Sequence, residues 1–388
     1  MPLVQPSIAS AAPAPTIDIR TATCADHRPT PYLLLDVDRA VEHHRQLAAA
    51  LPGTAVHYAV KANPDPVLLR ALAGAGSRFD VASPAEVAAV LRAGATVSDL
   101  VYSNPVKKRS DIATAASLGV RLFVVDSLEE TEKVAEAAPG TAILARLATS
   151  GAGSDWSLSR KYGCSELEAL AILRAADRLG LEAAGLSFHV GSQQRDPRAW
   201  DAPIAAAARV FARAERLGLA PRLLDLGGGF PAGLEGDCPP LAEYGAAIDM
   251  ALTAHFGDQH PETLIEPGRA VVADAGILVC TVIAVLRRGS RRWVYLDAGV
   301  FTGLVETLDE AIRYPLLTSA DGGPTGPCVL AGPTCDSADV LYERTPVELP
   351  LRLSEGDTVR LLSAGAYTTC YSTVGFNGFA PLATVLTG

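Results

Sequence analysis

The 388-residue sequence lacks the features that would place it in several large protein classes. No run of 18 uncharged apolar residues occurs, which excludes a membrane-spanning helix of ordinary length. The 33 Lys and Arg residues are outnumbered by 43 Asp and Glu residues, giving a formal net charge of −10. A broad basic surface for nucleic acid is therefore not expected. The composition, 49% hydrophobic and 20% charged, is typical of a compact globular protein.

Cysteine is sparse and scattered. The seven cysteines are odd in number and include no Cys-x-x-Cys pair, which argues against a disulfide framework and a structural zinc site. We therefore expect no metal and a reduced, cytoplasmic location. Four prolines interrupt the first fifteen residues, and no positive charge precedes an apolar run there. Residues 1–27 are thus predicted to be a flexible lead rather than a secretory signal.

Four common catalytic signatures are absent as well. The sequence contains no G-x-x-x-x-G-K-[ST], G-x-G-x-x-G, H-E-x-x-H or G-x-S-x-G motif. The usual signatures of NTPases, dinucleotide enzymes, zinc proteases and serine hydrolases are therefore missing. Any catalytic site must be found from residue types at the ends of predicted elements.

Short apolar runs alternate with helical patterns between Pro31 and about Ala270. After a first strand near 31–38, we expect strands near 55–62, 78–82, 100–103, 121–126, 142–148, 184–190, 222–227 and 263–266. Helices are expected between them at about 66–75, 84–93, 107–118, 128–138, 166–180, 201–218 and 241–255. Eight parallel strands with intervening helices close most simply into a (β/α)₈ TIM-like barrel. A doubly wound open sheet is the alternative.

The pattern changes after Ala270 to strands without long helices, separated by turns rich in Gly and Pro. The expected strands are Leu278–Leu286, Arg292–Asp297, Cys328–Ala331 and Thr358–Leu362. We therefore predict three parts: a lead over 1–27, a barrel over 28–270 and a C-terminal all-β domain over 271–388. The first strand at 31–38 has the alternative of packing with the β-domain.

Lys61 ends the apolar run 56–60, at the carboxyl end of a predicted barrel strand. Barrel enzymes build their active sites at that end. A partly desolvated lysine there can lose its proton and form a Schiff base with an aldehyde. A strand-end lysine that only reaches solvent is the alternative.

Three other predicted strand ends carry polar residues or glycines. Residues 227–229 are three glycines whose backbone N–H groups suit an anion, and Glu266 to Arg269 follow the eighth strand, where barrels commonly bind phosphate. His189 and Ser192 close another strand. A tight turn, a surface ion pair and a structural histidine are the respective alternatives. Together with Lys61, these groups fit pyridoxal 5′-phosphate (PLP), which carries an aldehyde, a phosphate and an electron-accepting ring.

The motifs occur in an order that resembles a known family. They are YAVKAN at 58–63, FDVAS at 79–83, SFHVGS at 187–192, GGGFP at 227–231, EPGR at 266–269, GPTCD at 332–336 and FNGF at 376–379. This series is similar to that of the PLP-dependent basic amino-acid decarboxylases with the alanine-racemase fold, also called fold type III. Within them it most resembles the short bacterial form of ornithine decarboxylase. The resemblance covers about residues 28–385.

The resemblance implies a role for each matching residue. Lys61 would hold PLP as a Schiff base, His189 would stack on the ring and Glu266 would face the pyridine nitrogen. The supporting groups and phosphate contacts would be Asp80, Glu86, Arg146, Ser192, Gly227, Gly228, Gly229, Gly268, Arg269 and Tyr367.

The family also implies a head-to-tail homodimer in which the partner's β-domain completes each site. Cys335 and Asp336 would reach into the partner's site. After CO₂ leaves, a thiol such as Cys335 can return a proton to Cα. One carboxylate at Asp336 suits the distal ammonium of ornithine and repels a substrate that ends in a carboxylate. An inert thiol and a turn residue are the alternatives.

A second acid that family members place on the substrate amine has no unambiguous equivalent. The segment 301–315 offers three acids. Asp309 is the first choice, Glu310 the second and Glu306 the third.

These features predict a carboxy-lyase that converts L-ornithine to putrescine and CO₂ in polyamine biosynthesis. A lysine or dual lysine/ornithine decarboxylase is the nearest alternative, because one methylene changes binding by only about 1–3 kcal/mol. Diaminopimelate decarboxylase is less favoured, because that family pairs the cysteine with Glu whereas Asp336 follows Cys335. Alanine racemase is less favoured still, because racemases lack the GPTCD motif. An inactive regulatory homologue is the alternative from another class.

Overall fold

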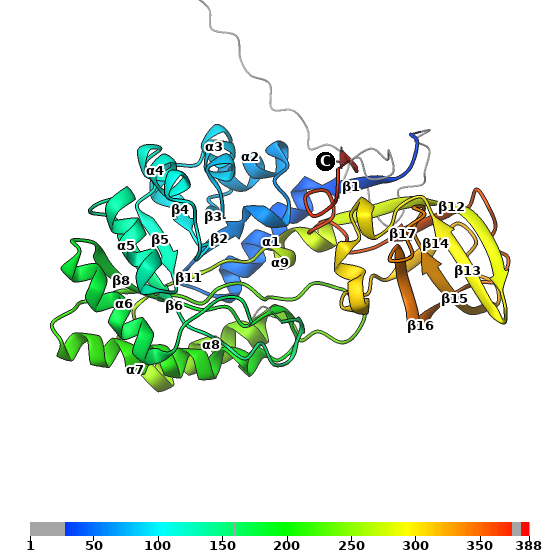
Figure 1. The fold of residues 1–388 in the computed structure, drawn as a ribbon. Helices are drawn as coiled ribbons and strands as arrows, with labels where there is room; N and C mark the ends of the chain where they lie inside the picture. Colours follow the sequence, from blue (N-terminus) through cyan, green and yellow to red (C-terminus); the bar gives the residue numbers. More distant parts are fainter. Residues whose placement is uncertain (1–27, 158–159, 375–381, 388) are drawn as a thin grey trace, which may run out of the picture.

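The computed structural model describes residues 28–157, 160–374 and 382–387. Two bodies lie side by side, a barrel ringed by helices and a mostly β domain (Figure 1). The barrel strands are β2 (Thr54–Ala59), β3 (Arg78–Val81), β4 (Leu100–Tyr102), β5 (Leu122–Val125), β6 (Ala142–Arg146), β8 (Glu182–Ser187), β10 (Leu223–Asp225) and β11 (Glu262–Ile265). All neighbouring pairs are parallel, and β11 pairs with β2 to close the ring. The predicted eight-stranded barrel is confirmed, and closure excludes the open sheet.

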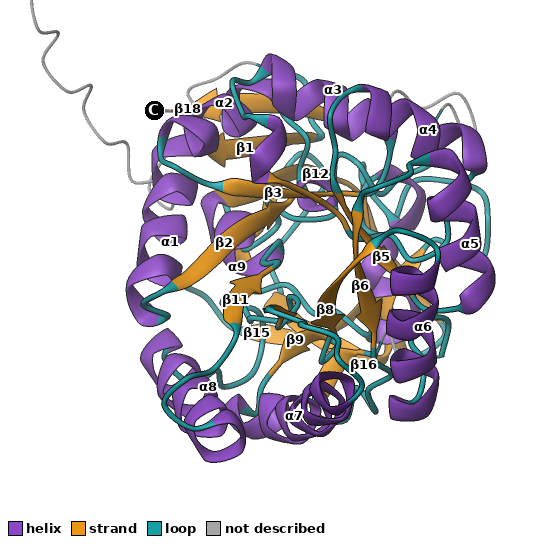
Figure 2. Cartoon of the chain, turned by 90° about the vertical axis from the view of Figure 1, so that its left-hand side faces the viewer, coloured by secondary structure: helices purple, strands orange, loops and turns teal. Residues whose placement is uncertain are grey.

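Helices surround the barrel (Figure 2). They are α1 (Val37–Ala50), α2 (Pro66–Gly74), α3 (Pro84–Arg92), α4 (Arg109–Ser117), α5 (Leu128–Ala137), α6 (Glu166–Arg178), α7 (Asp201–Arg216) and α8 (Leu241–Phe256). The sequence predicted seven of these and missed α1. The first strand, β1 (Tyr32–Asp36), is shorter than expected because Asp36 caps the helix that follows by accepting the Arg39 N–H at 2.9 Å.

Serine caps fix where several helices begin after their strands. Ser83 accepts the N–H of Glu86 at the start of α3, and Ser165 accepts that of Glu168 at the start of α6. Glu168 returns the contact to the Ser165 N–H, completing a capping box. Each such cap stabilises a helix by about 1 kcal/mol. The turns between strand and helix are therefore defined locally, which also fixes the residues at the strand ends.

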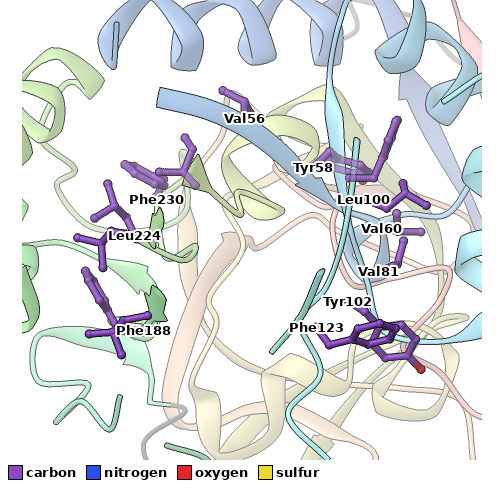
Figure 3. Close-up of a cluster of buried hydrophobic side chains, with 14 of the residues drawn as sticks. Val56, Tyr58, Val60, Val81, Leu100, Tyr102, Phe123, Phe188, Leu224 and Phe230 are labelled. Carbon is purple, nitrogen blue, oxygen red and sulfur yellow. The ribbon is translucent and has the colours of Figure 1, made fainter. Parts of the chain in front are cut away.

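The barrel has two apolar layers. An inner cluster, which includes Val101, Val124 and Leu144, is separate from the layer beneath the helices. A larger cluster lies between the strands and the helices; Figure 3 shows part of it, with Val56, Tyr58 and Phe123 among the labelled side chains. Alternate residues of each strand thus point to opposite layers, as a β-strand requires.

The second sheet has eight strands: β1, β12 (Gly276–Arg288), β13 (Arg291–Leu296), β14 (Leu316–Thr318), β15 (Thr325–Ala331), β16 (Val340–Pro350), β17 (Thr358–Leu361) and β18 (Ala383–Thr387). β1 pairs antiparallel with β12 and parallel with β18. The first strand therefore belongs to this sheet, even though the chain then enters the barrel. The sequence missed β14, β16 and β18. β16 lies at an edge, and proline is tolerated there although it breaks the usual strand pattern.

Two further findings concern the described residues only. No helix among them has the length and apolar content needed to cross a bilayer. Within the same ranges, no group of three or more His, Cys, Asp or Glu side chains is arranged to hold a metal ion. The predicted lead over 1–27 and the FNGF motif at 376–379 lie outside the described residues.

One glycine permits two barrel strands to approach closely. A Cβ atom on Gly185 of β8 would lie 1.8 Å from the carbonyl oxygen of Leu223 in β10. We predict that Gly185→Ala lowers the free energy of unfolding by more than about 2 kcal/mol, because backbone must shift to relieve the clash. Urea denaturation measures the change.

Gly74→Ala is the matched control, since a Cβ at this end of α2 would meet no atom within 4 Å. It should change the free energy of unfolding by less than about 1 kcal/mol. Equal midpoints for both variants would contradict the role given to Gly185.

Candidate active site

A pocket of about 350 Å³ opens at the carboxyl ends of the barrel strands. Its lining comprises Lys61, Ala82, Ser103, Asn104, Pro105, Arg146, Ser157, Arg160, Lys161, Tyr162, His189 and Glu266. Four of the residues predicted from the sequence, Lys61, Arg146, His189 and Glu266, therefore share one pocket.

A larger cavity, of about 700 Å³, opens at the amino ends of the same strands. None of the predicted site residues lines it. Its charged side chains include Arg222, which pairs with Glu182 and Glu262 at 3.0 and 3.7 Å. The cavity with the larger volume therefore lies at the end of the barrel without the predicted site residues. The smaller pocket is the candidate site because those residues line it.

Lys61 lies in a short 3₁₀ turn, η1 (Val60–Ala62), directly after β2. Its ammonium is 3.0 Å from the carboxylate of Asp80, which lies one residue before the end of β3 and is 1% exposed. Lys61 itself is half exposed; burial lowers its pKa, but the nearby charges, that of Asp80 first, together with the hydrogen bond to Asp80 outweigh burial and raise that pKa. The Asp80 carboxylate therefore favours the protonated Lys61 amine when no aldehyde is bound, and this buried counter-charge was not foreseen from the sequence.

Two more carboxyl groups lie beside this pair. Glu266 accepts a hydrogen bond from the Ser103 hydroxyl, and its side chain is also hydrogen-bonded to Asp225. Burial, followed by the nearby Asp80 charge, raises the pKa of Glu266 to about 7. Burial and Glu266 raise the pKa of Asp225 as well. A pair of buried acids in contact favours sharing one proton.

Glu86 has a more structural position than predicted. Its carboxylate accepts the backbone N–H of Ala82, while its own N–H is held by Ser83 at the start of α3. Burial raises the pKa of Glu86. The residue thus fixes the backbone of Ala82, which lines the pocket, and does not line it itself.

His189 is a neutral ring at the pocket wall. Burial, then the charges of Arg146 and Lys61, lower its pKa well below the usual range. Its Nδ1 accepts the N–H of Gly191 at 3.0 Å, which fixes the ring. A Cβ on Gly228 would lie 3.1 Å from its Nε2, so glycine leaves room for the imidazole. A neutral, oriented imidazole is suited to stack on an aromatic ring.

Arg269 lies where an anion is expected. Its guanidinium donates to the Ser192 hydroxyl at 3.1 and 3.3 Å and lies 5.0 Å from the centre of the Tyr367 ring. It is buried, yet its Nη1 has no hydrogen-bond partner. A buried cationic donor in this state fits an anionic phosphate.

The glycines near Arg269 cannot be enlarged. A Cβ would lie 2.1 Å from the Phe188 carbonyl oxygen at Gly227, 2.5 Å from the Gly191 carbonyl oxygen at Gly229 and 2.9 Å from the Tyr367 hydroxyl at Gly268. Gly227 and Gly229 also have positive φ angles of 68° and 105°. Glycine is therefore required at these positions by close packing and, at Gly227 and Gly229, by the positive φ angles as well.

The acids and the thiol predicted to contact substrate lie outside this chain's pocket. Cys335 and Asp336 are exposed between β15 and β16, and Asp336 accepts the Ala338 N–H at 2.8 Å. Asp309 is 82% exposed and pairs with Arg344 at 2.7 Å. Glu310 accepts three backbone N–H groups of β16, those of residues 343–345. Glu306 points inward, to Arg269.

Sequence reasoning missed several residues at the site. Ser103 directly follows β4 and Asp225 ends β10, and the same strand-end argument that found Lys61 would have found them. Lys161 and Tyr162 line the pocket from a loop with no such signal. Cys370 was not singled out either; its Sγ lies 3.0 Å from the Lys61 carbonyl oxygen.

Comparisons with known proteins agree with this geometry. Residues 37–273 match the family described as "Pyridoxal-dependent decarboxylase, pyridoxal binding domain". The chain is 36% identical over 366 residues to the lysine/ornithine decarboxylase of Selenomonas ruminantium, covering 94% of this chain and 91% of that one. It is 35% identical over 362 residues to the chloroplastic ornithine decarboxylase of Nicotiana glutinosa, covering 90% and 82%. The crystal structure of SrLDC with PLP and cadaverine superposes with a TM-score of 0.84 at 36% identity, covering 93% and 91%.

The acid pair makes a pH-dependent stability testable. The folded chain retains a proton on Glu266 up to about pH 7, whereas the unfolded chain releases it near the ordinary value of 4.5. Between these values the folded state binds more protons, so the free energy of unfolding falls as pH rises. We predict that, in the PLP-free protein, Glu266→Gln reduces this pH-dependent decrease in the free energy of unfolding by about 1–3 kcal/mol.

Urea denaturation at about pH 5 and 7.5 measures the slope of the free energy of unfolding against pH, because the Glu266 proton is lost between these values. Glu343→Gln, which breaks the exposed pair with Arg291, is the control and should leave the slope unchanged. An unchanged slope in Glu266→Gln would contradict the assignment of the raised pKa.

Proposed function

The chain belongs to the fold type III family of PLP-dependent basic amino-acid decarboxylases, and we propose that its own reaction converts L-ornithine to putrescine and CO₂. The family match covers residues 37–273 and confirms the resemblance carried by the sequence motifs. The cofactor is therefore PLP. The observation that carries the proposal is the convergence of a lysine, buried acids and an arginine at one end of the barrel.

Bound PLP supplies an electron sink for the pair left at Cα when the carboxylate departs. We assign attachment to Lys61, because it follows a barrel strand and its ammonium is held by a buried carboxylate. Lys161 also lines the pocket, but it extends from a loop over the Tyr162 ring. Asp80 orients the Lys61 amine, and the shared proton of Glu266 and Asp225 is available to a ring nitrogen. His189 is assigned to the ring face and Arg269, with Ser192, to the phosphate.

Substrate recognition is proposed to use the partner subunit of a homodimer. Cys335 and Asp336 are exposed on the β-domain and do not line the pocket of their own chain. A second copy placing this loop over the pocket would bring a proton donor and a carboxylate to the substrate. One carboxylate at the far end favours a substrate with a distal ammonium. Asp309 is proposed as a further contact; its exposed carboxylate would need the same arrangement.

Lysine is the second candidate substrate. A relative at 36% identity is named lysine/ornithine decarboxylase, and SrLDC was solved with cadaverine. Ornithine is preferred because the chain is also similar to an ornithine decarboxylase, whereas Asp336 after Cys335 suits the distal ammonium of either substrate. An inactive regulatory role is disfavoured because Lys61, Glu266, Arg269 and Cys335 are all present. The cytoplasmic location and a role in polyamine biosynthesis stay predictions.

Product identification tests the reaction. Purified protein with PLP is offered ornithine, lysine, arginine or meso-diaminopimelate separately, and amines are measured by mass spectrometry. We expect putrescine to be the dominant product. Dominant cadaverine would overturn the ornithine assignment while keeping the family, and no product from any of the four would contradict basic amino-acid decarboxylation.

Subunit mixing tests the shared site. Lys61→Ala and Cys335→Ala should each be inactive as homodimers, because one lacks the attachment amine and the other the proton donor. After exchange, half of the dimers are mixed and each has one intact site, so about a quarter of the activity should return. No recovery after exchange verified by native mass spectrometry would place both residues in one subunit's site.

A further inference from the structure

We propose that Glu306 is a positioning residue for the cofactor phosphate: its carboxylate holds the Arg269 guanidinium so that the Nη1 amino group remains available to the phosphate. This inference rests on PLP binding, and it does not depend on which amino acid is decarboxylated. It gives Glu306 a role different from the substrate contact considered for it from the sequence.

The contact is short and buried. Arg269 Nη2 lies 2.7 Å from Glu306 Oε1, and the two side chains are 3% and 6% exposed. Residues so enclosed do not reach a substrate ammonium in the pocket, and Glu306 is not among the lining residues. A buried ion pair keeps its geometry because neither charge can be left alone without a large cost.

The guanidinium is held from two sides. Nη2 donates both to Glu306 and to the Ser192 hydroxyl, and Nε donates to the same hydroxyl. The Tyr367 ring lies against the guanidinium, with 5.0 Å between the charged carbon and the ring centre. Only Nη1 is left without a hydrogen bond. Because a guanidinium is planar and rigid, fixing Nη2 and Nε also fixes the direction of Nη1.

Glu306 also links the two bodies at this point. It lies in η6 (Val305–Glu310), between strands of the β-domain, whereas Arg269 begins α9 (Arg269–Val272) after the last barrel strand. Its carbonyl oxygen accepts the Ile312 N–H at 3.0 Å, and Leu304 and Ile312 are fully buried in the β-domain core. The carboxylate is thus presented to Arg269 from an anchored backbone, as a positioning role requires.

The alternative is that the Glu306 carboxylate only replaces the phosphate as the partner of Arg269. Glu306 could pair with Arg269 only while no cofactor is bound and repel the phosphate when it arrives. The two accounts predict opposite changes in PLP affinity when the carboxylate is removed, so one titration separates them.

The experiment is a titration of PLP-free protein with PLP, followed by absorbance near 420 nm, and a parallel titration with pyridoxal, which lacks the phosphate. Glu306→Ala should weaken PLP binding at least about tenfold, the equivalent of losing one charge-assisted hydrogen bond. Its affinity for pyridoxal should change less than about twofold, since no phosphate contact is lost. Glu306→Gln should stay within about threefold of the parent for PLP, because its amide oxygen accepts the same hydrogen bond.

Two further variants complete the design. Glu306→Asp keeps the charge but shortens the reach, so it should weaken PLP binding like Glu306→Ala and serves if the alanine variant does not fold. Glu343→Ala, in the exposed pair with Arg291, should bind PLP like the parent. Unchanged or tighter PLP binding in both Glu306→Ala and Glu306→Asp overturns the proposal, and so does an equal loss for PLP and pyridoxal. Decarboxylation is not read in any arm, so failure here is distinct from failure of the ornithine assignment.

Discussion

The ion pair between Lys61 and Asp80 is the contact on which the candidate active site depends. Asp80 is almost completely buried, and a carboxylate in such a place needs a partner. Lys61 supplies it, and at the neighbouring Glu266 burial first and the Asp80 charge second raise the pKa, while Lys61 partly opposes them. Burial and the neighbouring acids thus favour one proton shared between Glu266 and Asp225. The chemistry of the site follows from this balance of buried charges.

The barrel brings these groups together because its strands are parallel. All eight carboxyl ends meet at one rim, so residues far apart in the sequence, such as Asp80 and Glu266, become neighbours. The second sheet contributes differently. Its strand β1 precedes the barrel in the sequence and its strand β12 follows the barrel. These two strands pair, so the chain returns to the same sheet after forming the barrel. This return places η6 and its Glu306 against Arg269, the first residue of α9 after the last barrel strand.

The sequence predicted the barrel well because each strand and helix has a local signal. All eight strands and seven of eight surrounding helices lie within a few residues of their expected ranges. The helix α1 was missed because its start depends on the single cap Asp36 within an assumed strand. β14 and β18 are short, and β16 carries two prolines, so the alternation that reveals a strand is weak in each.

The site was predictable only where residues end regular strands. Lys61, His189 and Glu266 follow that rule, and Ser103 and Asp225 would have followed it too. The order of preference among Asp309, Glu310 and Glu306 could not be read in this way. That segment is irregular, with positive φ angles at Asp309 and Glu310, so spacing does not tell which side chain points inward. The structure turns only Glu306 inward, and Arg269 explains why an acid is tolerated there.

The proposed attachment of PLP to Lys61, at the carboxyl end of the barrel, can be tested directly. Reduction of the PLP-loaded protein with borohydride, followed by peptide mass spectrometry, locates the attachment directly. The account predicts one phosphopyridoxyl group on the peptide that contains Lys61. A label on Lys161 in the same pocket, or on the buried Lys107, whose pKa burial lowers to about 8, would contradict it.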